Sequence, residues 1–269
     1  LKHGGIANRT KVSIKWVDSE FLTPESLDDT FAGVDGIIIP GGFGSRGTEG
    51  MILAANYARE NKIPFLGICL GMQMAMVAFA RNVLGYEDAN SSELNPDTTH
   101  PVVDLMPDQN GIENLGGTLR LGSYPCVLDK KSKAYALYGT ELINERHRHR
   151  FEINNHYRDD FTSHGMMISG QSPDGHIVEM IELPDHPFYV GIQAHPELKS
   201  RPNHAHPLFA GFVESAEEQG VLRRAKKLLM KRNHLSEPEA HRYLQKTSMD
   251  TGRTMTESAH MVTMLIQED

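Results

Sequence analysis

Apolar runs and amphipathic segments alternate along the first two hundred residues. Short, continuous apolar runs have the pattern of strands buried on both faces of a sheet, and they lie at 35–39, 64–68, 177–182 and 189–193. Apolar residues at helical spacing occur at 23–31, 51–60 and 72–82. The alternation predicts a doubly wound, mostly parallel α/β sheet, whose ligands bind beyond the carboxyl ends of the strands.

Weaker patterns predict a few further features. Strict alternation over 12–17 indicates a strand, and 134–137 could form another. The stretch 87–125 is rich in Asn, Asp, Pro and Gly, which favours loops and a hairpin around Gly116-Gly117. Leu1 to Gly5 has the pattern of a helix end, so we expect the chain to be a piece of a longer protein.

A different pattern begins near residue 216. Apolar residues at helical spacing recur in 216–232, and two capping-box sequences, Ser236 to Glu239 and Thr254 to Glu257, open two more helices. The residues predicted to face inward in the second helix are Ala240, Tyr243, Leu244 and Thr247. We therefore predict two domains, 1–215 and a three-helix module over 216–269.

The composition indicates the environment in which the protein is expected to work. The 39% hydrophobic and 23% charged residues are typical of a water-soluble globular protein, no apolar run reaches membrane-spanning length, and we expect a cytoplasmic location. The two cysteines, Cys69 and Cys126, cannot form a disulfide scaffold. The net charge is −8, yet 221–253 carries nine basic residues against three acidic ones. That excess favours a polyanion partner or a solvated helix face.

Cys69 occupies the most informative position in the chain. It follows the apolar run 64–68, is flanked by Gly67 and Gly71, and precedes a helical pattern. A sharp strand-to-helix turn of this kind lifts a nucleophile above the sheet, and a helix N-terminus favours the reactive thiolate. The alternative is a buried cysteine that packs as a small hydrophobe.

The glycine-rich segment 40–47 also follows a predicted strand, and it should share one crevice with Cys69. It lacks the sequence frames of phosphate-binding and dinucleotide-binding loops. We interpret it as a source of backbone N–H groups for an oxyanion hole, completed by the amide of the residue after Cys69. A plain turn is the alternative.

A third group of candidate site residues follows the last predicted strand of the sheet. His195 and Glu197 follow the strand at 189–193, and a carboxylate at this spacing can orient an imidazole as a base for Cys69. A metal site with His204 and His206 is the alternative, but no third ligand has typical spacing, so we predict no metal. Upstream, alternation in 145–154 should place three arginines on one strand face and two histidines on the other. The arginines suit carboxylate binding better than nucleic acid.

Together the motifs resemble those of class I (triad) glutamine amidotransferases, which have a flavodoxin-like fold. They are Pro-Gly-Gly-Phe-Gly at 40–44, Gly-Ile-Cys-Leu-Gly-Met-Gln at 67–73 and His-Pro-Glu at 195–197. Further segments bring the resemblance to the branch whose glutaminase domain serves the amination of UTP to CTP; they lie at 2–5, 44–47, 89–93, 146–155 and 206–212. The resemblance covers roughly residues 1–215.

The resemblance implies a role for each matching residue. Cys69 would attack the side-chain amide of L-glutamine and form a glutamyl thioester, His195 would transfer protons, and Glu197 would orient His195. Gly42 and Leu70 would supply the oxyanion hole. The residues implied to bind glutamine are Gly42, Leu70, Gln73, Glu93 and Arg150.

The resemblance also implies a partner for the ammonia. In the family an N-terminal amidoligase (synthetase) domain uses ATP and Mg²⁺ to aminate UTP, and the full-length enzyme is a homo-oligomer. That domain has no counterpart in this sequence, so this chain is expected to hydrolyse glutamine without a cofactor of its own. A cysteine hydrolase or peptidase of related fold is a further hypothesis from the shared chemistry.

Residues 220–267 resemble an ANTAR domain, a small helical module that binds RNA hairpins. The resemblance implies RNA contacts by basic residues of the first helix, among them Arg223, Arg224, Lys226 and Lys227. The alternative is a helical tail that dimerises or packs on the glutaminase domain. A second functional hypothesis follows: an RNA-binding regulatory fusion whose glutaminase-like half binds glutamine without turnover.

Overall fold

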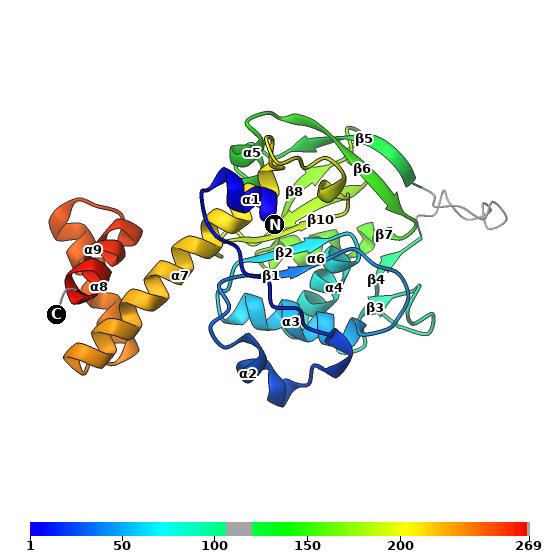
Figure 1. The fold of residues 1–269 in the computed structure, drawn as a ribbon. Coiled ribbons are helices and arrows are strands. Elements are labelled where there is room, and N and C mark those ends of the chain that lie inside the picture. Colours follow the sequence, from blue (N-terminus) through cyan, green and yellow to red (C-terminus); the bar gives the residue numbers. More distant parts are fainter. Residues whose placement is uncertain (106–119, 268–269) are drawn as a thin grey trace. The chain divides into compact units, whose positions relative to one another are not determined.

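The computed structural model describes residues 1–105 and 120–267 (Figure 1). The hairpin predicted around Gly116-Gly117 therefore lies outside the described residues. The chain divides into two compact units, residues 1–213 and residues 214–269. Within the described ranges, every helix is too short or too polar to traverse a bilayer.

A seven-stranded mixed sheet forms the centre of the first unit (Figure 1). Its described strands lie in the order β1-β2-β10-β9-β8-β5-β6. The α/β fold class is confirmed, but the large sheet is not mostly parallel: within it, parallel pairing is confined to β1, β2 and β10, and the other pairings are antiparallel. The reason is that short turns, without a crossover helix, join β8 to β9 and β9 to β10.

The strands of the large sheet are β1 (Ile37–Ile39), β2 (Phe65–Ile68), β5 (Arg120–Leu128), β6 (Leu142–His149), β8 (Met167–Gln171), β9 (Val178–Glu182) and β10 (Tyr189–Ile192). A small sheet contains β3 (Asn90–Ser91), β4 (Pro101–Asp104) and β7 (Glu152–Ile153). The α-helices that lie wholly in this unit are α1 (Lys2–Ala7), α2 (Leu27–Phe31), α3 (Thr48–Glu60), α4 (Leu70–Phe79), α5 (Lys133–Tyr138) and α6 (Arg158–Ser163).

Both faces of the large sheet are covered by helices (Figure 1). Phe65 of β2 and Tyr189 of β10 stack with ring centroids 4.4 Å apart, in the core that they share with α3 and α4. Their neighbours Leu66 and Val190 point into a second core with α5 and the start of α7. This two-sided burial explains why the strands read as continuous apolar runs, and it fixes their carboxyl ends rigidly.

The predicted strand at 12–17 is wrong. The segment forms no ladder with another described strand, and the Trp16 side chain is 88% exposed. Only Val12 packs against a core. Alternation of polar and apolar residues forms a strand only where a neighbouring strand supplies hydrogen bonds. No described strand lies beside residues 12–17 to supply them.

The possible strand at 134–137 is instead the helix α5. The Ser132 hydroxyl caps the helix by accepting a hydrogen bond from the Tyr135 N–H, and Gly139 ends it in the left-handed region with φ 69°. The buried Glu182 carboxylate accepts hydrogen bonds from the N–H groups of Lys133 and Ala134. These capping contacts outweigh the short apolar pattern.

The expected helix end at the N-terminus is also different. Gly4 and Gly5 lie inside α1 and not behind it. A Cβ atom on Gly4 would lie 2.4 Å from the Phe209 carbonyl oxygen. Glycine is therefore needed there because the helix backbone approaches another helix closely.

The second unit is a three-helix module with its own small core. It contains the end of α7 (Pro207–Asn233) together with α8 (Glu237–Thr251) and α9 (Met255–Gln267). Its fully buried apolar residues are Val221, Ala225, Leu229, Ala240, Leu244, Ala259 and Val262. Tyr243 was predicted to face inward, but it is 46% exposed because Ala240 and Leu244 alone fill that side of α8.

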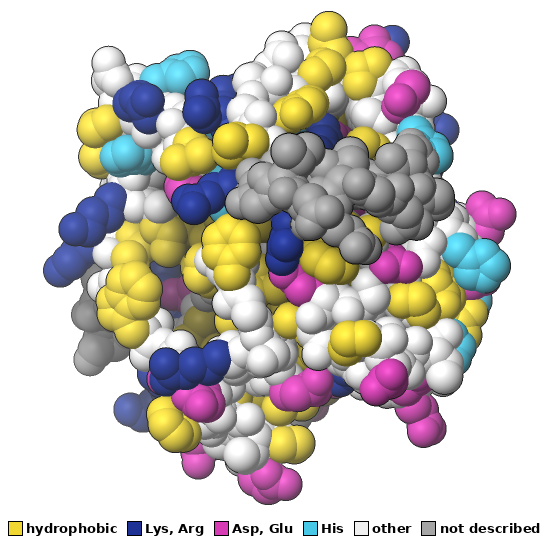
Figure 2. Space-filling view, turned by 90° about the vertical axis from the view of Figure 1, so that its right-hand side faces the viewer, with side chains coloured by type: hydrophobic (Ala, Val, Ile, Leu, Met, Phe, Trp, Pro, Cys, Tyr) yellow, Lys and Arg dark blue, Asp and Glu magenta, His cyan; other side chains and the backbone are white. Residues whose placement is uncertain are grey.

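Charge is unevenly displayed on the surface. Figure 2 shows one face of the molecule, on which basic side chains gather mainly in the left half and acidic side chains lie along the lower edge. The net charge of −8 therefore does not describe the local field on this face.

Candidate active site

Cys69 stands at the turn between β2 and α4, as the sequence predicted. Its backbone has φ 50° and ψ −105°, a conformation that residues other than glycine rarely adopt. The Cys69 N–H donates to the Ile192 carbonyl at 2.7 Å, which ties the turn to the end of β10. A Cβ atom on Gly71 would lie 2.1 Å from the Ile39 carbonyl oxygen. Glycine at 71 thus lets the helix start against the end of β1.

His195 and Glu197 lie at the end of the neighbouring strand. The imidazole Nδ1 and the Glu197 Oε1 are 2.6 Å apart. The two-residue spacing would place both side chains on one side of an extended segment, but the segment is not extended: Pro196–Leu198 forms a turn of 3₁₀ helix that brings the carboxylate back to the ring. The His195 N–H donates to the Arg146 carbonyl at 2.7 Å, so β6 holds this loop from the other side.

His195 faces Cys69. A Cβ atom on Gly41 would lie 2.8 Å from His195 Cε1 and 3.5 Å from Cys69 Cβ, so both side chains border the same backbone atom. The His195 Nε2 is buried, and it has no hydrogen-bond partner in geometric range among the described residues. It is the ring atom left to serve the sulfur, because Nδ1 is taken by Glu197.

The electrostatics of the pair favour a charged imidazole. The neighbouring Cys69 and then the Glu197 carboxylate raise the pKa of His195 to about 10, against the effect of burial. Burial opposes ionisation of Glu197, but the contacts with His195 give that carboxyl a pKa below its ordinary value. His195 is therefore an imidazolium at neutral pH, which is the form that can donate a proton to a leaving group.

The glycine-rich segment 40–47 lies beside the strand-to-helix turn at Cys69. A Cβ atom on Gly42 would lie 3.4 Å from Leu70 Cδ2, so the two residues predicted to form an oxyanion hole are neighbours. Their positions agree with the spacing in the sequence, and their role as oxyanion donors stays a prediction.

Glu93 and Arg150 are brought together from distant parts of the chain. The Arg150 Nη2 donates to the Glu93 Oε1 at 3.2 Å, and 54% of the Arg150 side chain is exposed. The guanidinium also lies 5.8 Å from the centre of the Phe151 ring. One carboxylate and one accessible guanidinium are thus presented side by side.

Gln73 is buried one helical turn after Cys69, and its backbone N–H donates to the Cys69 carbonyl at 3.1 Å. Its side-chain Nε2 donates to the Phe151 carbonyl at 3.0 Å and to the Gln193 Oε1 at 3.2 Å. Gln193 in turn donates from Nε2 to the Cys69 sulfur at 3.6 Å. Gln193 was not among the predicted site residues, although a polar residue two positions before His195, at the end of an apolar strand, was a signal for it.

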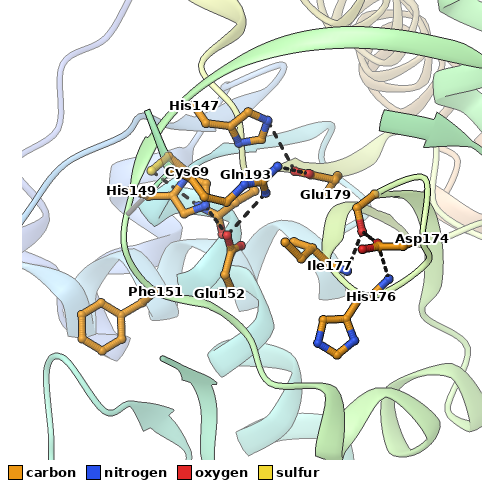
Figure 3. Close-up of polar contacts among 12 residues, drawn as sticks. Cys69, His147, His149, Phe151, Glu152, Asp174, His176, Ile177, Glu179 and Gln193 are labelled. Carbon is orange, nitrogen blue, oxygen red and sulfur yellow. Dashed lines mark hydrogen bonds and ion pairs between the residues drawn. The ribbon is translucent and has the colours of Figure 1, made fainter. Parts of the chain in front are cut away.

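The alternation predicted for 145–154 is confirmed as far as His149, where β6 ends, and it does not continue through Glu152 and Ile153, which are both buried. Along β6 the residues His147 and His149 are buried, while Arg146 and Arg148 are exposed. The two histidines belong to a buried charge cluster, which also includes Arg120, Glu152 and Glu179. Figure 3 shows these two glutamates and two histidines near Cys69 and Gln193.

Contacts in this buried charge cluster are short. Arg120 donates to Glu179 at 2.7 Å, and His149 Nε2 lies 2.8 Å from the Glu152 carboxylate. Burial, together with the charge of Arg120, lowers the pKa of His147 to about 2. His147 is therefore neutral, and its 3.5 Å separation from Glu179 is not a charge pair.

The residues considered for a metal site have other partners. His206 is buried, and its Nε2 lies 3.0 Å from Glu145 Oε1, while His204 forms an isolated β-bridge with Arg201. No group of three or more His, Cys, Asp or Glu in the described part of the chain is arranged to hold a metal ion.

Comparison with models of protein families identifies the class to which this fold and the strand-to-helix turn at Cys69 belong. The model of class I glutamine amidotransferases matches residues 1–215, so the chain belongs to this family. The model of the ANTAR domain matches residues 212–262.

The particular relatives are CTP synthases. The chain is 59% identical over 219 residues to CTP synthase of Clostridium beijerinckii, covering 81% of this chain and 41% of the relative. It is 58% identical over 213 residues to CTP synthase of Carboxydothermus hydrogenoformans, covering 79% of this chain and 40% of the relative. The chain thus spans about two fifths of the length of these relatives.

A solved structure places the likeness in one domain of such enzymes. The glutaminase domain of Trypanosoma brucei CTPS, determined with bound acivicin, is 37% identical and superposes with a TM-score of 0.76. The match covers 81% of this chain and 85% of that chain. The region of similarity is therefore the glutaminase domain of CTP synthases.

Proposed function

We propose that residues 1–215 hydrolyse L-glutamine to glutamate and ammonia, as the glutaminase domain of a CTP synthase. The observation that carries this proposal is the arrangement of Cys69, His195 and Glu197, in which a cysteine outside any disulfide, at a strand-to-helix turn, faces an imidazolium held by a carboxylate. The similarity to CTP synthases supports UTP as the final acceptor of the ammonia, in a synthetase domain that uses ATP and Mg²⁺.

The reaction follows from these groups in two half-reactions. With their shared proton on His195, the deprotonated Cys69 sulfur attacks the side-chain carbonyl carbon of glutamine, and the tetrahedral oxyanion forms beside the backbone N–H groups of Gly42 and Leu70. His195 gives its proton to the amide nitrogen, the C–N bond breaks, and ammonia leaves. Water then attacks the thioester while neutral His195 accepts a proton, so that glutamate leaves and the pair of deprotonated sulfur and imidazolium is restored.

Glu93 and Arg150 suit the other end of the substrate. A free amino acid carries an ammonium and a carboxylate on one carbon, and the neighbouring carboxylate and guanidinium match that pair of charges. Arg150 then binds the α-carboxylate, and Glu93 the α-ammonium. A peptide lacks both charges at an internal residue, so this pair favours glutamine over the peptidase hypothesis.

The experiment compares two matched cysteine variants. Cys69→Ala should abolish ammonia release from glutamine, whereas Cys126→Ala should retain it, because Cys126 lies on β5 as a buried core residue and has no role in the proposed reaction. Activity that survives in Cys69→Ala would refute the assignment. Binding of glutamine without ammonia release in the unmodified chain would favour the regulatory hypothesis instead. Acivicin, found in the Trypanosoma domain, should protect Cys69 from iodoacetamide.

We propose a second function for the helical unit, which is binding of a structured RNA. It is supported by the ANTAR match over 212–262 and by a basic face of α7. Arg224, Lys227 and Lys231 are exposed and recur at helical spacing, whereas Lys226 is paired with Glu237 at 2.6 Å. The exposed three are therefore better placed for phosphate contacts than Lys226.

The test for RNA binding compares the exposed basic residues of α7 with the paired Lys226. Replacing Arg224, Lys227 and Lys231 together by Ala should weaken binding to an RNA hairpin and reduce its salt dependence, while Lys226→Ala should have a smaller effect. Filter binding or fluorescence anisotropy at several salt concentrations measures both. Absence of binding by the unmodified chain at low salt would exclude this function.

A further inference from the structure

Gln193 is the polar side chain in closest described contact with the reacting sulfur, apart from the triad itself. It follows β10, is fully buried, and its backbone N–H donates to the Glu179 carbonyl at 2.9 Å. Its side-chain Nε2 lies 3.6 Å from Cys69 Sγ, a normal length for a hydrogen bond to sulfur. A buried amide at this position therefore requires an explanation.

The hydrogen-bond pattern fixes which way the Gln193 amide points. Gln73 Nε2 donates to two acceptors, the Phe151 carbonyl and Gln193 Oε1. The Gln193 oxygen thus faces a donor, so the Gln193 nitrogen must face the sulfur. The chain of donors runs from Gln73 through Gln193 to Cys69, and each link is buried.

We infer that Gln193 is a positioning residue that holds the Cys69 thiolate by N–H donation, and that Gln73 fixes it in this orientation. The inference rests on the proposed role of Cys69 as the nucleophile. A neutral donor stabilises the thiolate without competing for the proton of His195. Gln73 acts here through its side-chain nitrogen, and its own contact with glutamine stays a prediction.

Two variants separate hydrogen bonding from shape. Gln193→Met keeps the size of the side chain but removes the donor, and Gln193→Glu keeps the shape but places a carboxylate oxygen against the sulfur. Gln171→Met, at a half-buried glutamine whose oxygen accepts from Arg158, is the matched control. The readouts are the rate of Cys69 alkylation by iodoacetamide as a function of pH, and kcat and KM for glutamine.

Loss of one charge-assisted donor should slow Cys69 alkylation at pH 7 by about tenfold to a hundredfold in Gln193→Met, and further in Gln193→Glu. The pH midpoint of alkylation should move upward, and kcat should fall with KM changed by less than about threefold. Gln171→Met should keep the unmodified values. Cys126 is buried, so its protection from iodoacetamide shows that each variant remains folded.

Two results would overturn the inference. One is an unchanged alkylation profile in both Gln193 variants, and the other is an effect of Gln193→Met without an effect of Gln193→Glu, which would indicate a role in shape alone. Failure of the proposed function is distinguishable, because it would show as ammonia release by Cys69→Ala, whatever the alkylation profile of the Gln193 variants.

Discussion

The two units treat their charged residues in opposite ways. The first buries a set of them next to its candidate active site, including Arg120, Glu152 and Glu179. In the described part of the second unit no charged side chain is buried, and its basic residues lie on helix surfaces. Buried charges act through fixed geometry at short range, whereas exposed ones act through a screened field. The first arrangement suits chemistry on one bond, and the second suits a polyanion.

The largest expected effect is the loss of glutamine turnover in Gly41→Ala. The new methyl group would lie 2.8 Å from His195 Cε1, so the imidazole must shift away from Cys69. We expect a fall of about a hundredfold or more in kcat/KM, because a displacement of this size disrupts catalytic alignment. The control is Gly33→Ala, where no atom lies within 4 Å but φ is +75°, so stability falls and activity does not. Full activity in Gly41→Ala would contradict this geometry.

The next effect concerns the core of the second unit. Leu244 is fully buried there, and Leu244→Ala should destabilise this unit by about 2–5 kcal/mol. Hydrogen exchange of the α8 and α9 amides should accelerate, while glutamine hydrolysis stays unchanged, because the triad lies in the other unit. A loss of glutamine hydrolysis in proportion to the loss of stability would show that the two units are coupled, and it would contradict their separate treatment.

A pH profile tests the fixed electrostatics of the first unit. His195 has a pKa of about 10 in the fold, above its ordinary value of 6.5, so the imidazolium is present at neutral pH and is lost as pH rises through about 10. The stabilisation of the fold by the charged His195 is likewise complete below pH 6.5, and it is lost as pH rises from 6.5 through about 10.

Removing the Glu197 charge should shift this behaviour. Because Glu197 helps to raise the pKa of His195, Glu197→Gln should move the alkaline fall of kcat downward by about one pH unit. Asp185→Asn, a charge change outside the site, serves as the control. An alkaline limb that stays in place would mean that Glu197 does not act on the imidazole.

The smallest expected effect lies at the start of α9. Thr254 Oγ1 accepts from the Glu257 N–H at 3.1 Å, and the Glu257 carboxylate accepts from the Thr254 N–H at 2.8 Å. Thr254→Ala should therefore cost about 1 kcal/mol in stability, measured by urea unfolding. Thr263→Ala, in the middle of the same helix, should cost less, since its hydroxyl only bonds back to the Ala259 carbonyl. Equal losses would argue against a capping role.

Much of the candidate site could be predicted from the sequence because its signals are local. Cys69 follows a buried strand and is framed by glycines, and the burial of His147 and His149 repeats with the period of a strand. His195 and Glu197 are two residues apart, so their contact depends on one turn. The catalytic roles of these residues stay predictions until the variants are measured.

The features that could not be predicted depend on contacts between distant segments. Gln193 contacts Cys69 and Gln73 across 124 and 120 positions of sequence, and a strand pattern does not reveal such partners. The helix at 133–138 depends on the carboxylate of Glu182, which lies about fifty residues away. The segment 12–17 shows the reverse case, in which a local pattern finds no partner.

Cys69 is also a place where the needs of folding and of chemistry conflict. With φ 50° and ψ −105°, its backbone adopts a conformation that glycine tolerates far better than any residue with a side chain. Selection for stability alone would thus replace this cysteine by glycine. The proposed thiol chemistry explains a cysteine at this position, and directed evolution for thermal tolerance alone would tend to remove the proposed nucleophile.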